Sequence, residues 1–437
     1  MIELEKCLKW LKAGSYKKVC IQIPDHLLAD SAGIVLYLQE NSDAFFYVIG
    51  DTTYENCCND KLSADHIQAD ACIHFGHACL SCTNDLPTFY MFPKKELNFQ
   101  VFCEEFQKYF QDDAKRLLFF YDISYAYIIE QIFEQLKSKY KNLVLSTLNA
   151  TSNVPYITTP STDDFHNSIL GRSYHVQPDH EIQSYDAVYL GSNDKTLMTL
   201  SMSIPVNLWH WFDGSKFNEY SILSSTWLKR RNFLVEKIKD ADVFGIVIAS
   251  LNIKDYLKIT EMLKQILKKM NKKIYLFNVG KITPTKLANF QEVDIFVAVT
   301  CSESSLIDSR DYFKPIVTPF EVDLAFNAGR AYSAYHAIDF KQILPGGSKY
   351  EEFQVSTDTD VSLTSGKLRT LEDNCLTNEN SALTPKSLGV MANTQIDTNF
   401  LQSRSWSGLE QKLGESSVSL AVDGRTGIPT NYTNEQL

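Results

Sequence analysis

The stretch VFGIVIASLNIKDYLKITEMLKQILKKMNKKIYLFNVG (243–280) decides the fold of this chain. It begins and ends with continuous apolar runs typical of buried strands, and the residues between them (255–270) have the spacing of an amphipathic helix. Another apolar run, VDIFVAVT (293–300), follows. Continuous apolar strands that alternate with amphipathic helices form parallel sheets covered on both faces. The stretch therefore predicts an α/β fold with a mainly parallel sheet.

The same alternation of strand and helix occurs twice earlier in the chain. The expected strands are KKVCIQIP (17–24), FFYVIG (45–50), ACIHFG (71–76), RLLFFYD (116–122), NLVLST (142–147) and AVYLG (187–191). Three such blocks of about 100 residues indicate an internal triplication. The predicted domains are 1–103, 104–223 and 224–347, each a mainly parallel sheet flanked by helices, followed by a flexible linker and a short docking tail in 348–437.

The composition excludes several classes of protein. The 437 residues are 44% hydrophobic and 22% charged, which is typical of a soluble globular protein. No run of 18 apolar residues occurs, and the start of the chain, MIELEKCLKWLKAG, lacks the layout of a signal peptide. The net charge of −11 disfavours nucleic acid, because neutralising phosphates requires a basic face. We therefore expect a cytoplasmic protein that binds neither membranes nor nucleic acid.

The segment GDTTYENCCNDKLSADHIQADACIHFGHACLSC (50–82) carries the chemistry. Ten cysteines in a chain without a secretory signal argue against a disulfide framework and in favour of buried thiols and metal ligands. Cys57 and Cys58 fall in the loop after one expected strand, just before a helix, and Cys79 and Cys82 follow the next strand. Ligands bind at the carboxyl ends of strands in open α/β sheets, so both loops should open onto the same edge.

Two ligand sets are compatible with this spacing. Cys57 or Cys58, or both, could form a four-thiolate zinc site with the Cys-x-x-Cys pair at Cys79 and Cys82. Alternatively, Cys301 could join the site, because it directly follows the expected strand VDIFVAVT. On this interpretation Cys301 occupies in the third block the position that Cys57 and Cys58 hold in the first. The spacing alone leaves both sets open.

Several long motifs resemble those of the diphthamide synthesis subunit family. They are GDTTYENCCND (50–60), IHFGHACLS (73–81), VGKITPTKLANFQEVDIFVAVTC (279–301) and LIDSRDYFKPIVTPFEVDLA (306–325). The sequence RSWSGLE, with LPGG upstream, is similar to the eukaryotic second subunits of 2-(3-amino-3-carboxypropyl)histidine synthase in particular. The resemblance covers about residues 17–430.

The resemblance implies three similar α/β domains around a central [4Fe–4S] cluster. In catalytic members one cysteine from each domain holds the cluster, and one iron stays free for S-adenosylmethionine. A 3-amino-3-carboxypropyl radical derived from that cofactor is transferred to a histidine of elongation factor 2, which is the first step of diphthamide biosynthesis. Thiolate ligation of such clusters is ordinary chemistry.

This chain departs from the catalytic pattern, because it has no cysteine between Cys103 and Cys301. By resemblance to the second subunits, the expected cluster ligands are Cys58, Cys79 and Cys301, with Cys57 as a possible substitute for Cys58. The implied function is an accessory subunit, with no catalytic residue of its own, that supports reduction of the cluster of a catalytic subunit 1. The implied partners are that subunit in a heterodimer, elongation factor 2 and a small electron-donor protein. The alternative is a structural zinc-binding scaffold.

The remaining candidate residues have simpler interpretations. His74 and His77 are expected to make hydrogen bonds rather than to bind metal, Asp25 to cap a helix, and Asp51 to hydrogen-bond its own turn. The cysteines expected to be core residues are Cys7, Cys20, Cys72 and Cys103, whereas Cys375 falls in the predicted linker.

Overall fold

The computed structural model describes residues 2–52, 56–80, 86–148, 168–251, 253–355, 359–364, 366, 368–369, 427–428 and 431–432. The chain divides into two compact units, Met1–Glu379 and Asn380–Leu437. In the second unit the described residues are strands β19 (Gly427–Ile428) and β20 (Asn431–Tyr432), which pair antiparallel. The two strands belong to the stretch GRTGIPTNY (424–432) of the expected docking tail, whereas its earlier part FLQSRSWSGLEQKLG (400–414) and most of the predicted linker lie outside the described residues. Within the described part of the chain, no helix combines the length and the apolar character needed to span a bilayer.

The first sheet has four parallel strands in the order β2-β1-β3-β4. The elements of this part are α1 (Ile2–Gly14), β1 (Lys18–Gln22), α2 (Ser31–Glu40), β2 (Phe45–Ile49), α3 (Lys61–His66), β3 (Ala71–Phe75) and β4 (Thr88–Met91). Apolar residues of α1, such as Leu11, pack with Val19 and Ile73 of the strands in one core. The strand β3 is buried along its whole length, as expected for a strand with neighbours on both sides.

The second sheet has the strand order β12-β11-β10-β5-β6, and only the pair β11–β12 is antiparallel. Its elements are α4 (Phe99–Tyr109), β5 (Leu117–Tyr121), α5 (Ile129–Lys137), β6 (Leu143–Leu145), β10 (Asp186–Leu190), α6 (Lys195–Ser203), β11 (Trp209–Phe212) and β12 (Phe217–Tyr220). A small sheet is formed beside it by β7 (Thr147–Leu148), β8 (Ser168–Ile169) and β9 (Arg172–Ser173).

The third sheet has four parallel strands in the order β14-β13-β15-β16. Its elements are α7 (Thr226–Asp240), β13 (Val243–Ile248), α8 (Tyr256–Lys269), β14 (Lys273–Asn278), α9 (Pro284–Leu287), β15 (Ile295–Val299), β16 (Ile316–Val317), α10 (Pro319–Phe326) and α11 (Phe340–Ile343). Helix α10 packs against α7 and against α8, and the three helices contribute to the largest apolar cluster, in agreement with the amphipathic pattern of 255–270.

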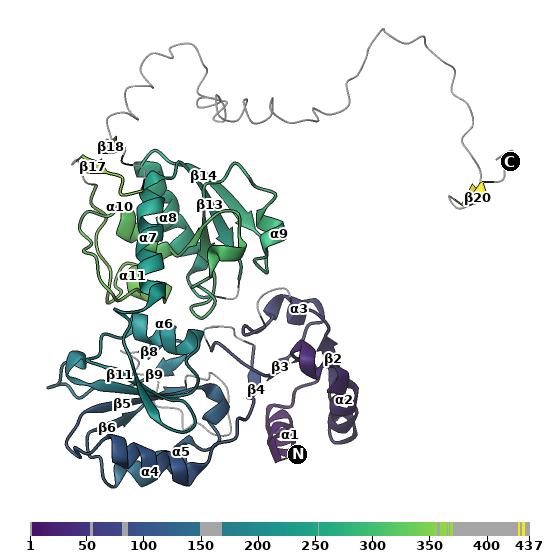
Figure 1. The fold of residues 1–437 in the computed structure, drawn as a ribbon. Helices are drawn as coiled ribbons and strands as arrows, with labels where there is room; N and C mark the ends of the chain where they lie inside the picture. Colours follow the sequence, from purple (N-terminus) through teal and green to yellow (C-terminus); the bar gives the residue numbers. More distant parts are fainter. Residues whose placement is uncertain are drawn as a thin grey trace. The chain divides into compact units, whose positions relative to one another are not determined.

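The three sheets share one strand order (Figure 1). In each, the first strand of the block lies between the second and the third, and the fourth lies outside the third. Figure 1 also shows helices on the faces of the sheets, so the predicted α/β fold with mainly parallel sheets is confirmed. The shared order agrees with the predicted repeat. All three sheets nevertheless belong to one compact unit, so the domain boundaries remain predictions.

One predicted boundary runs through a helix. Residues 103 and 104 both lie inside α4, and Phe102, Cys103 and Phe106 pack into the core of the second sheet. The second block therefore includes α4, and Cys103 belongs to it. The apolar face of α4 contains aromatic residues, and such a pattern does not indicate against which sheet the helix packs.

Folded structure continues beyond residue 348, where the linker was predicted to begin. Phe353 packs against the core of the third sheet. Strands β17 (Asp360–Val361) and β18 (Leu368–Arg369) form a hairpin that is tied to α7, because Arg369 Nε donates to Asp240 Oδ1 at 2.7 Å. The Ser362 hydroxyl donates to the same carboxylate, also at 2.7 Å. The described residues between 348 and 369 are thus part of the folded third block.

Candidate metal centre

Cys57 and Cys58 lie in the loop between β2 and α3, as the sequence predicted. The loop ends at Asp60, whose carboxylate caps α3 by accepting from the Ser63 backbone N–H at 3.1 Å. This cap fixes the point at which the loop turns into the helix. The two cysteines are therefore held on a short segment with a fixed end.

Gln22, the last residue of β1, fixes the backbone of this loop. Its side chain is buried, and Nε2 donates to the carbonyl groups of Asn56 at 3.1 Å and Cys58 at 2.9 Å. Its Oε1 accepts from the Asp60 backbone N–H at 3.1 Å. The sequence reasoning missed this residue, although a glutamine in the otherwise apolar strand KKVCIQIP was a signal for a buried polar contact.

Cys79 lies in the loop after β3 and contacts the first cysteine loop directly. Its backbone N–H donates to the Cys57 carbonyl at 3.0 Å. The turn into this loop uses Gly76 at φ +94°, a conformation in which a Cβ would also lie 3.1 Å from the Pro24 side chain. His74 Nε2 hydrogen-bonds the His77 carbonyl at 3.0 Å, which confirms the hydrogen-bonding role expected for His74.

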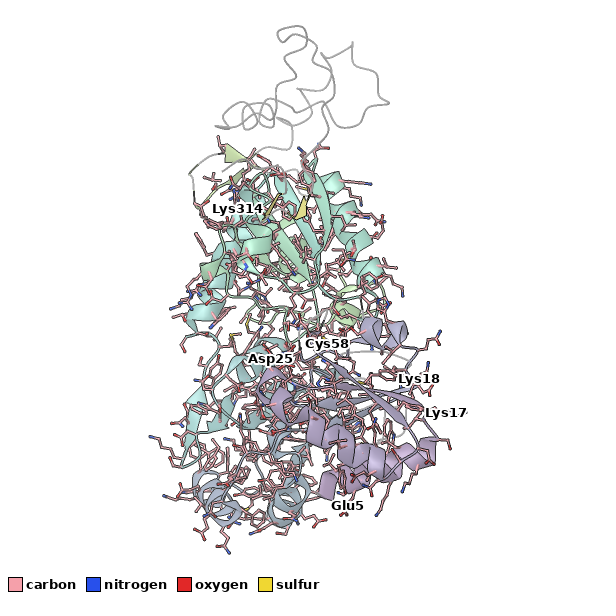
Figure 2. All side chains as sticks on the ribbon, turned by 90° about the vertical axis from the view of Figure 1, so that its right-hand side faces the viewer. Glu5, Lys17, Lys18, Asp25, Cys58 and Lys314 are labelled. Carbon is pink, nitrogen blue, oxygen red and sulfur yellow. The ribbon has the colours of Figure 1, made fainter. Side chains whose placement is uncertain are left out.

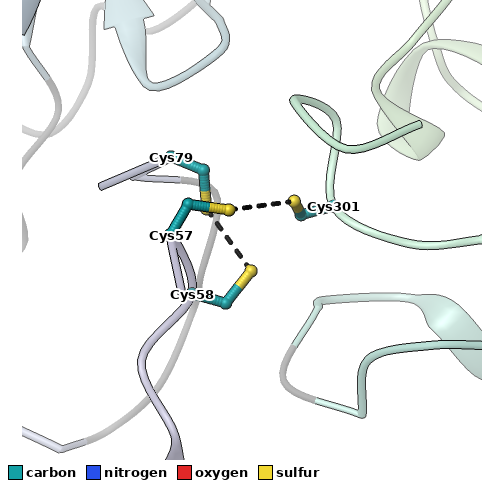
Figure 3. A group of neighbouring side chains, drawn as sticks. All are labelled: Cys57, Cys58, Cys79 and Cys301. Carbon is teal, nitrogen blue, oxygen red and sulfur yellow. Dashed lines mark hydrogen bonds between the residues drawn. The ribbon is translucent and has the colours of Figure 1, made fainter. Parts of the chain in front are cut away.

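Four thiols converge at one point (Figure 3). The Sγ atoms of Cys57, Cys58, Cys79 and Cys301 all lie within 4.8 Å of one another. Cys57 Sγ is 3.8 Å from Cys301 Sγ, and Cys58 Sγ is 3.5 Å from Cys79 Sγ. Cys57 is half-buried and the other three are at most 2% exposed. Figure 2 locates Cys58 where side chains of the first and third sheets meet.

This convergence brings together all the cysteines predicted as ligands and adds Cys57 to them. Cys82 lies outside the described residues. The topology corrects one detail: Cys301 follows β15, which is the third strand of its sheet, so its equivalent in the first sheet is Cys79 after β3. Cys57 and Cys58 follow a second strand, whose counterpart in the third sheet is β14. The assumed equivalence failed because the sequence gives no strand order.

The thiols perturb one another electrostatically. Hydrogen bonding by the Cys57, Cys58 and Cys79 thiols holds the pKa of Cys301 well below its usual value and outweighs the effect of burial. The same interaction raises the pKa of Cys57, because a thiolate at Cys301 disfavours a second negative charge beside it. Of these two cysteines, Cys301 is therefore the one that becomes a thiolate more readily, and the thiolate is the form that binds metal.

Two ion pairs join the first and third sheets around the thiols. Lys281 Nζ, after β14, is 2.5 Å from Asp51 Oδ1, after β2. His77 Nε2 pairs with Glu303, and although burial opposes protonation, this carboxylate raises the pKa of His77. The sequence reasoning did not identify Lys281 or Glu303, because nothing in a sequence indicates which surface charges of two domains will meet.

The second sheet approaches the same region through the start of α6. The Thr196 hydroxyl lies 3.5 Å from Glu303 Oε1. A cavity of about 550 Å³ separates this part of the second sheet from the third. It is lined by Asn193, Asp194, Lys195, Met198, Tyr220, Trp227, Ala249, Ile282, Thr300, Ser304, Leu306, Ile307, Asp308 and Tyr312. Two of its lining residues, Thr300 and Ser304, come from the loop that carries Cys301.

The other predicted residues divide into confirmed and wrong assignments. Cys7, Cys20, Cys72 and Cys103 are buried core residues, as expected. Burial raises the pKa of Cys7 to about 12 and that of Cys103 to about 11, so both remain protonated thiols at neutral pH. The prediction that Asp25 caps a helix is wrong. Asp25 is the first residue of a 3₁₀ helix (Asp25–Asp30), the preceding residue is Pro24, and no side chain caps the start of this helix. Cys375 lies outside the described residues.

Comparison with known proteins identifies the family. A family model described as "Putative diphthamide synthesis protein" matches residues 23–336. The chain is 35% identical to 2-(3-amino-3-carboxypropyl)histidine synthase subunit 2 of Xenopus laevis, with 99% of this chain and 92% of the relative covered. It is 32% identical to the protein of the same name from Schizosaccharomyces pombe, with 99% and 90% covered.

Two solved structures have a similar fold. Dph2 from Pyrococcus horikoshii aligns with a TM-score of 0.58 at 20% identity, covering 81% of this chain and 97% of the other. A second structure of that protein, described as containing a 4Fe-4S cluster, aligns with a TM-score of 0.56 at 20% identity, covering 74% and 89%. At this identity the likeness concerns the fold. Taken with the extent of the family match and with relatives above 30% identity over nearly the whole chain, it leads to one conclusion: this chain belongs to the diphthamide synthesis protein family.

Proposed function

We propose that this chain is the iron–sulfur accessory subunit of a heterodimeric 2-(3-amino-3-carboxypropyl)histidine synthase. The observation that carries the proposal is the convergence of four buried or half-buried thiols from two different sheets. The names of the relatives support it, since each is a subunit 2 and so implies a second chain. The complex would act in the cytoplasm on elongation factor 2, with S-adenosylmethionine as the source of the transferred group.

The donor set fits an iron–sulfur cluster in its chemistry. Among the described residues, the metal-binding group at this site consists of four cysteine thiols and includes no imidazole or carboxylate. Soft thiolate ligands select iron–sulfur clusters, zinc and copper(I) over harder metals. Cys58, Cys79 and Cys301 are the proposed ligands, and Cys57 is close enough to join them. A bound [4Fe–4S] cluster would supply one-electron transfer.

The residues of this chain would bind and orient the cluster rather than act on substrate. Gln22 and the Cys79 N–H fix the loop that carries two of the thiols. The Asp51–Lys281 and His77–Glu303 pairs hold the third sheet, and with it Cys301, against the first. No thiol comes to this site from the described part of the second sheet, which argues for electron supply to a catalytic subunit 1 rather than for group transfer by this chain.

The proposal is tested with the anaerobically purified heterodimer. Iron, sulfide and visible absorbance assigned to this subunit are expected. This chain alone, reduced with dithionite, should not transfer the aminocarboxypropyl group to elongation factor 2, whereas the heterodimer should. Removal of this subunit's cluster should slow multiple turnovers, which need repeated reduction, more than a single turnover with a pre-reduced partner. Transfer by this chain alone at the rate of the heterodimer would contradict the accessory role.

A structural zinc site is the second candidate, and the sulfur spacing favours it. Two thiolates on one tetrahedral zinc lie about 3.8 Å apart, because Zn–S bonds are about 2.3 Å long. The closest sulfur pairs here, at 3.5 and 3.8 Å, match that spacing. A four-iron cluster would need the sulfurs to move apart, since each binds its own iron. Metal analysis decides between the two candidates. A colourless protein with one zinc and no sulfide would mean that the site is a structural zinc site in a scaffold protein and not an iron–sulfur cluster.

A further inference from the structure

We infer that Cys57 and Cys58 bind the cluster at the same time, so that four thiolates of this chain occupy all its outer coordination positions, with Gln22 as the residue that positions both. This inference rests on the proposed iron–sulfur function and deepens it. Sequence reasoning treated the adjacent cysteines as substitutes for each other. The arrangement of the side chains indicates two separate roles.

The two neighbouring thiols occupy different places in the site. Cys57 Sγ lies 3.8 Å from Cys301 Sγ and 3.7 Å from the Ser304 hydroxyl. Cys58 Sγ lies 3.5 Å from Cys79 Sγ, and its thiol also interacts with Cys301. Figure 3 shows both side chains directed into the same space from one turn of the chain. Substitutes would share one position, whereas these two thiols fill two.

The backbone explains how adjacent residues can both face the site. In an extended strand, successive side chains point to opposite faces. Here three consecutive carbonyl groups are held by donors of the protein: Gln22 Nε2 binds those of Asn56 and Cys58, and the Cys79 N–H binds that of Cys57. Fixing every carbonyl of the turn fixes the direction of the side chains between them.

Cys57 thereby supplies the ligand that the second sheet does not. The cysteine of the second block among the described residues is Cys103, which is packed in the hydrophobic core of α4 and β5. The second sheet instead reaches this region with the Thr196 hydroxyl. A [4Fe–4S] cluster bound by four cysteines has a thiolate on each iron. A small molecule would then find no iron to bind, which suits a group that transfers electrons.

Oxidation of the cluster with ferricyanide tests directly whether four thiolates bind it. A four-iron cluster with one iron lacking a thiolate loses that iron as Fe²⁺ when ferricyanide removes one electron, and an EPR-active [3Fe–4S] cluster remains. The sample is the heterodimer with a partner whose own cluster cysteines are replaced by alanine. We expect no [3Fe–4S] signal from the native subunit and a strong one from Cys57→Ala and from Cys58→Ala. Cys103→Ala, a buried cysteine outside the site, is the control and should behave as the native subunit does.

The experiment distinguishes failure of the four-thiolate inference from failure of the proposed iron–sulfur function. A [3Fe–4S] signal from the native subunit as strong as that from the single variants means three thiolates, which overturns the inference and leaves the iron–sulfur function intact. Zinc without iron or sulfide overturns the proposed function and this inference with it. A second readout is the EPR spectrum of the reduced native cluster with and without S-adenosylmethionine. We expect no change, and a changed spectrum overturns the four-thiolate arrangement.

The positioning role of Gln22 has its own test. Gln22→Met keeps the side-chain volume and removes the amide, so the loop loses three hydrogen bonds, two to carbonyl groups of the turn and one from the Asp60 N–H. We expect the cluster to form but to yield the [3Fe–4S] signal, because one thiol no longer stays in place. Asn327→Leu is the matched control, since this equally buried amide binds backbone groups of another loop, Gly329 and Gln354. If Gln22→Met resists ferricyanide as the native subunit does, Gln22 has no positioning role.

Discussion

Cys301 connects the third sheet to the metal centre by a single side chain. The other three thiols of the group come from two loops of the first sheet. Cys301 is also the thiol whose pKa the others hold well below its usual value. Because Cys301 is the one thiol of the described group that comes from the third sheet, the candidate site depends heavily on it.

We predict that Cys301→Ser lowers metal affinity at least about ten-fold, because the loss of even an outer partner of a ligand costs about 10–100-fold. Iron and sulfide content after gel filtration of the anaerobic heterodimer measures this. Cys103→Ser is the control and should retain both. Unchanged iron in Cys301→Ser would place the site entirely in the first sheet.

At the residue scale, sequence reasoning found the thiols and missed what holds them. Cys58, Cys79 and Cys301 were identified because a thiol after an apolar strand, within a motif resembling a known family, is a local pattern. Gln22 and Glu303 were missed because their partners lie far away in the chain: Gln22 bonds a loop 34 to 38 residues later and Glu303 bonds His77, 226 residues earlier. Such pairs exist only once the sheets are placed together.

At the scale of elements, helices α7 and α10 are joined by a buried ion pair. Arg231 on α7 is 1% exposed and donates two hydrogen bonds to Glu321 on α10, which is fully buried. Glu321 also accepts from the Thr318 N–H at 2.7 Å and so closes a capping box at the start of α10. Arg231 also donates to the Ile316 carbonyl, at 3.3 Å. The Glu321 carboxylate thus both caps the start of α10 and joins α10 to α7.

We predict that Arg231→Met destabilises the protein by about 3–5 kcal/mol, because it leaves the buried Glu321 charge without a partner. The double variant Arg231→Met/Glu321→Gln should lose less, since the amide is neutral and its oxygen can still accept from Thr318. Urea unfolding at pH 7 measures both. If the double variant lost as much free energy of unfolding as Arg231→Met and Glu321→Gln lose together as single variants, the unpaired charge would not be the cause.

His336 connects α6 of the second sheet to the third block. Its backbone N–H donates to the Met202 carbonyl at 2.7 Å, and its ring is 1% exposed. Burial lowers the pKa of His336 to about 4, and the nearby Glu321 carboxylate opposes this only in part. In the unfolded chain the pKa of histidine is about 6.5. The unfolded state therefore binds the proton more readily, and stability falls as the pH falls.

We predict that the stability contributed by neutral His336 is complete above pH 6.5 and is lost as the pH falls from about 6.5 to about 4, on the order of 3 kcal/mol in total. His336→Gln has no such titration. The difference in free energy of unfolding between the native protein and this variant should therefore shrink over that range. A difference that stays constant with pH would show that His336 does not titrate as its burial implies.

At the scale of the whole molecule, the first compact unit extends well beyond the predicted end of the third domain. The sequence predicted that end at residue 347, because the following residues are polar and lack periodicity. The structure continues the packing through Phe353 to Arg369, whose guanidinium contacts Asp240, Glu236 and Asp360. Polar segments can be held by charges on a neighbouring helix, a possibility that hydrophobic periodicity does not reveal.

We predict that a chain ending at Glu379 has nearly the melting temperature of the full chain, whereas one ending at Gly347 melts about 2–3 °C lower, as expected for a loss of about 2 kcal/mol in a unit of this length. The cause is the loss of Phe353 from the core and of the contacts to α7. Calorimetry of the three metal-free chains measures this. Equal melting temperatures for the chains ending at 347 and 379 would restore the boundary that the sequence predicted.

The sheets themselves were the most predictable part of the molecule. Their central strands are continuous apolar runs such as VFGIVIAS, and all appear within a residue or two of the expected bounds. Strands β4, β11, β12 and β16 were not predicted, because they span only two to four residues and give no continuous apolar run. The strand order, on which the correspondence of Cys79 and Cys301 depends, results from packing between elements and cannot be read from their composition.

The division of the ligands between the first and third sheets has a consequence for the biosynthesis of the protein. Cys79 and Cys301 are separated by about 220 residues, which a ribosome adds in roughly 10–45 s at about 5–20 residues per second. During that interval the first sheet can fold and bring three thiols together, but the fourth does not yet exist. A site that needs all four thiols is therefore complete only after synthesis of the third block, and the early thiols must stay reduced until the chain that completes their site has emerged.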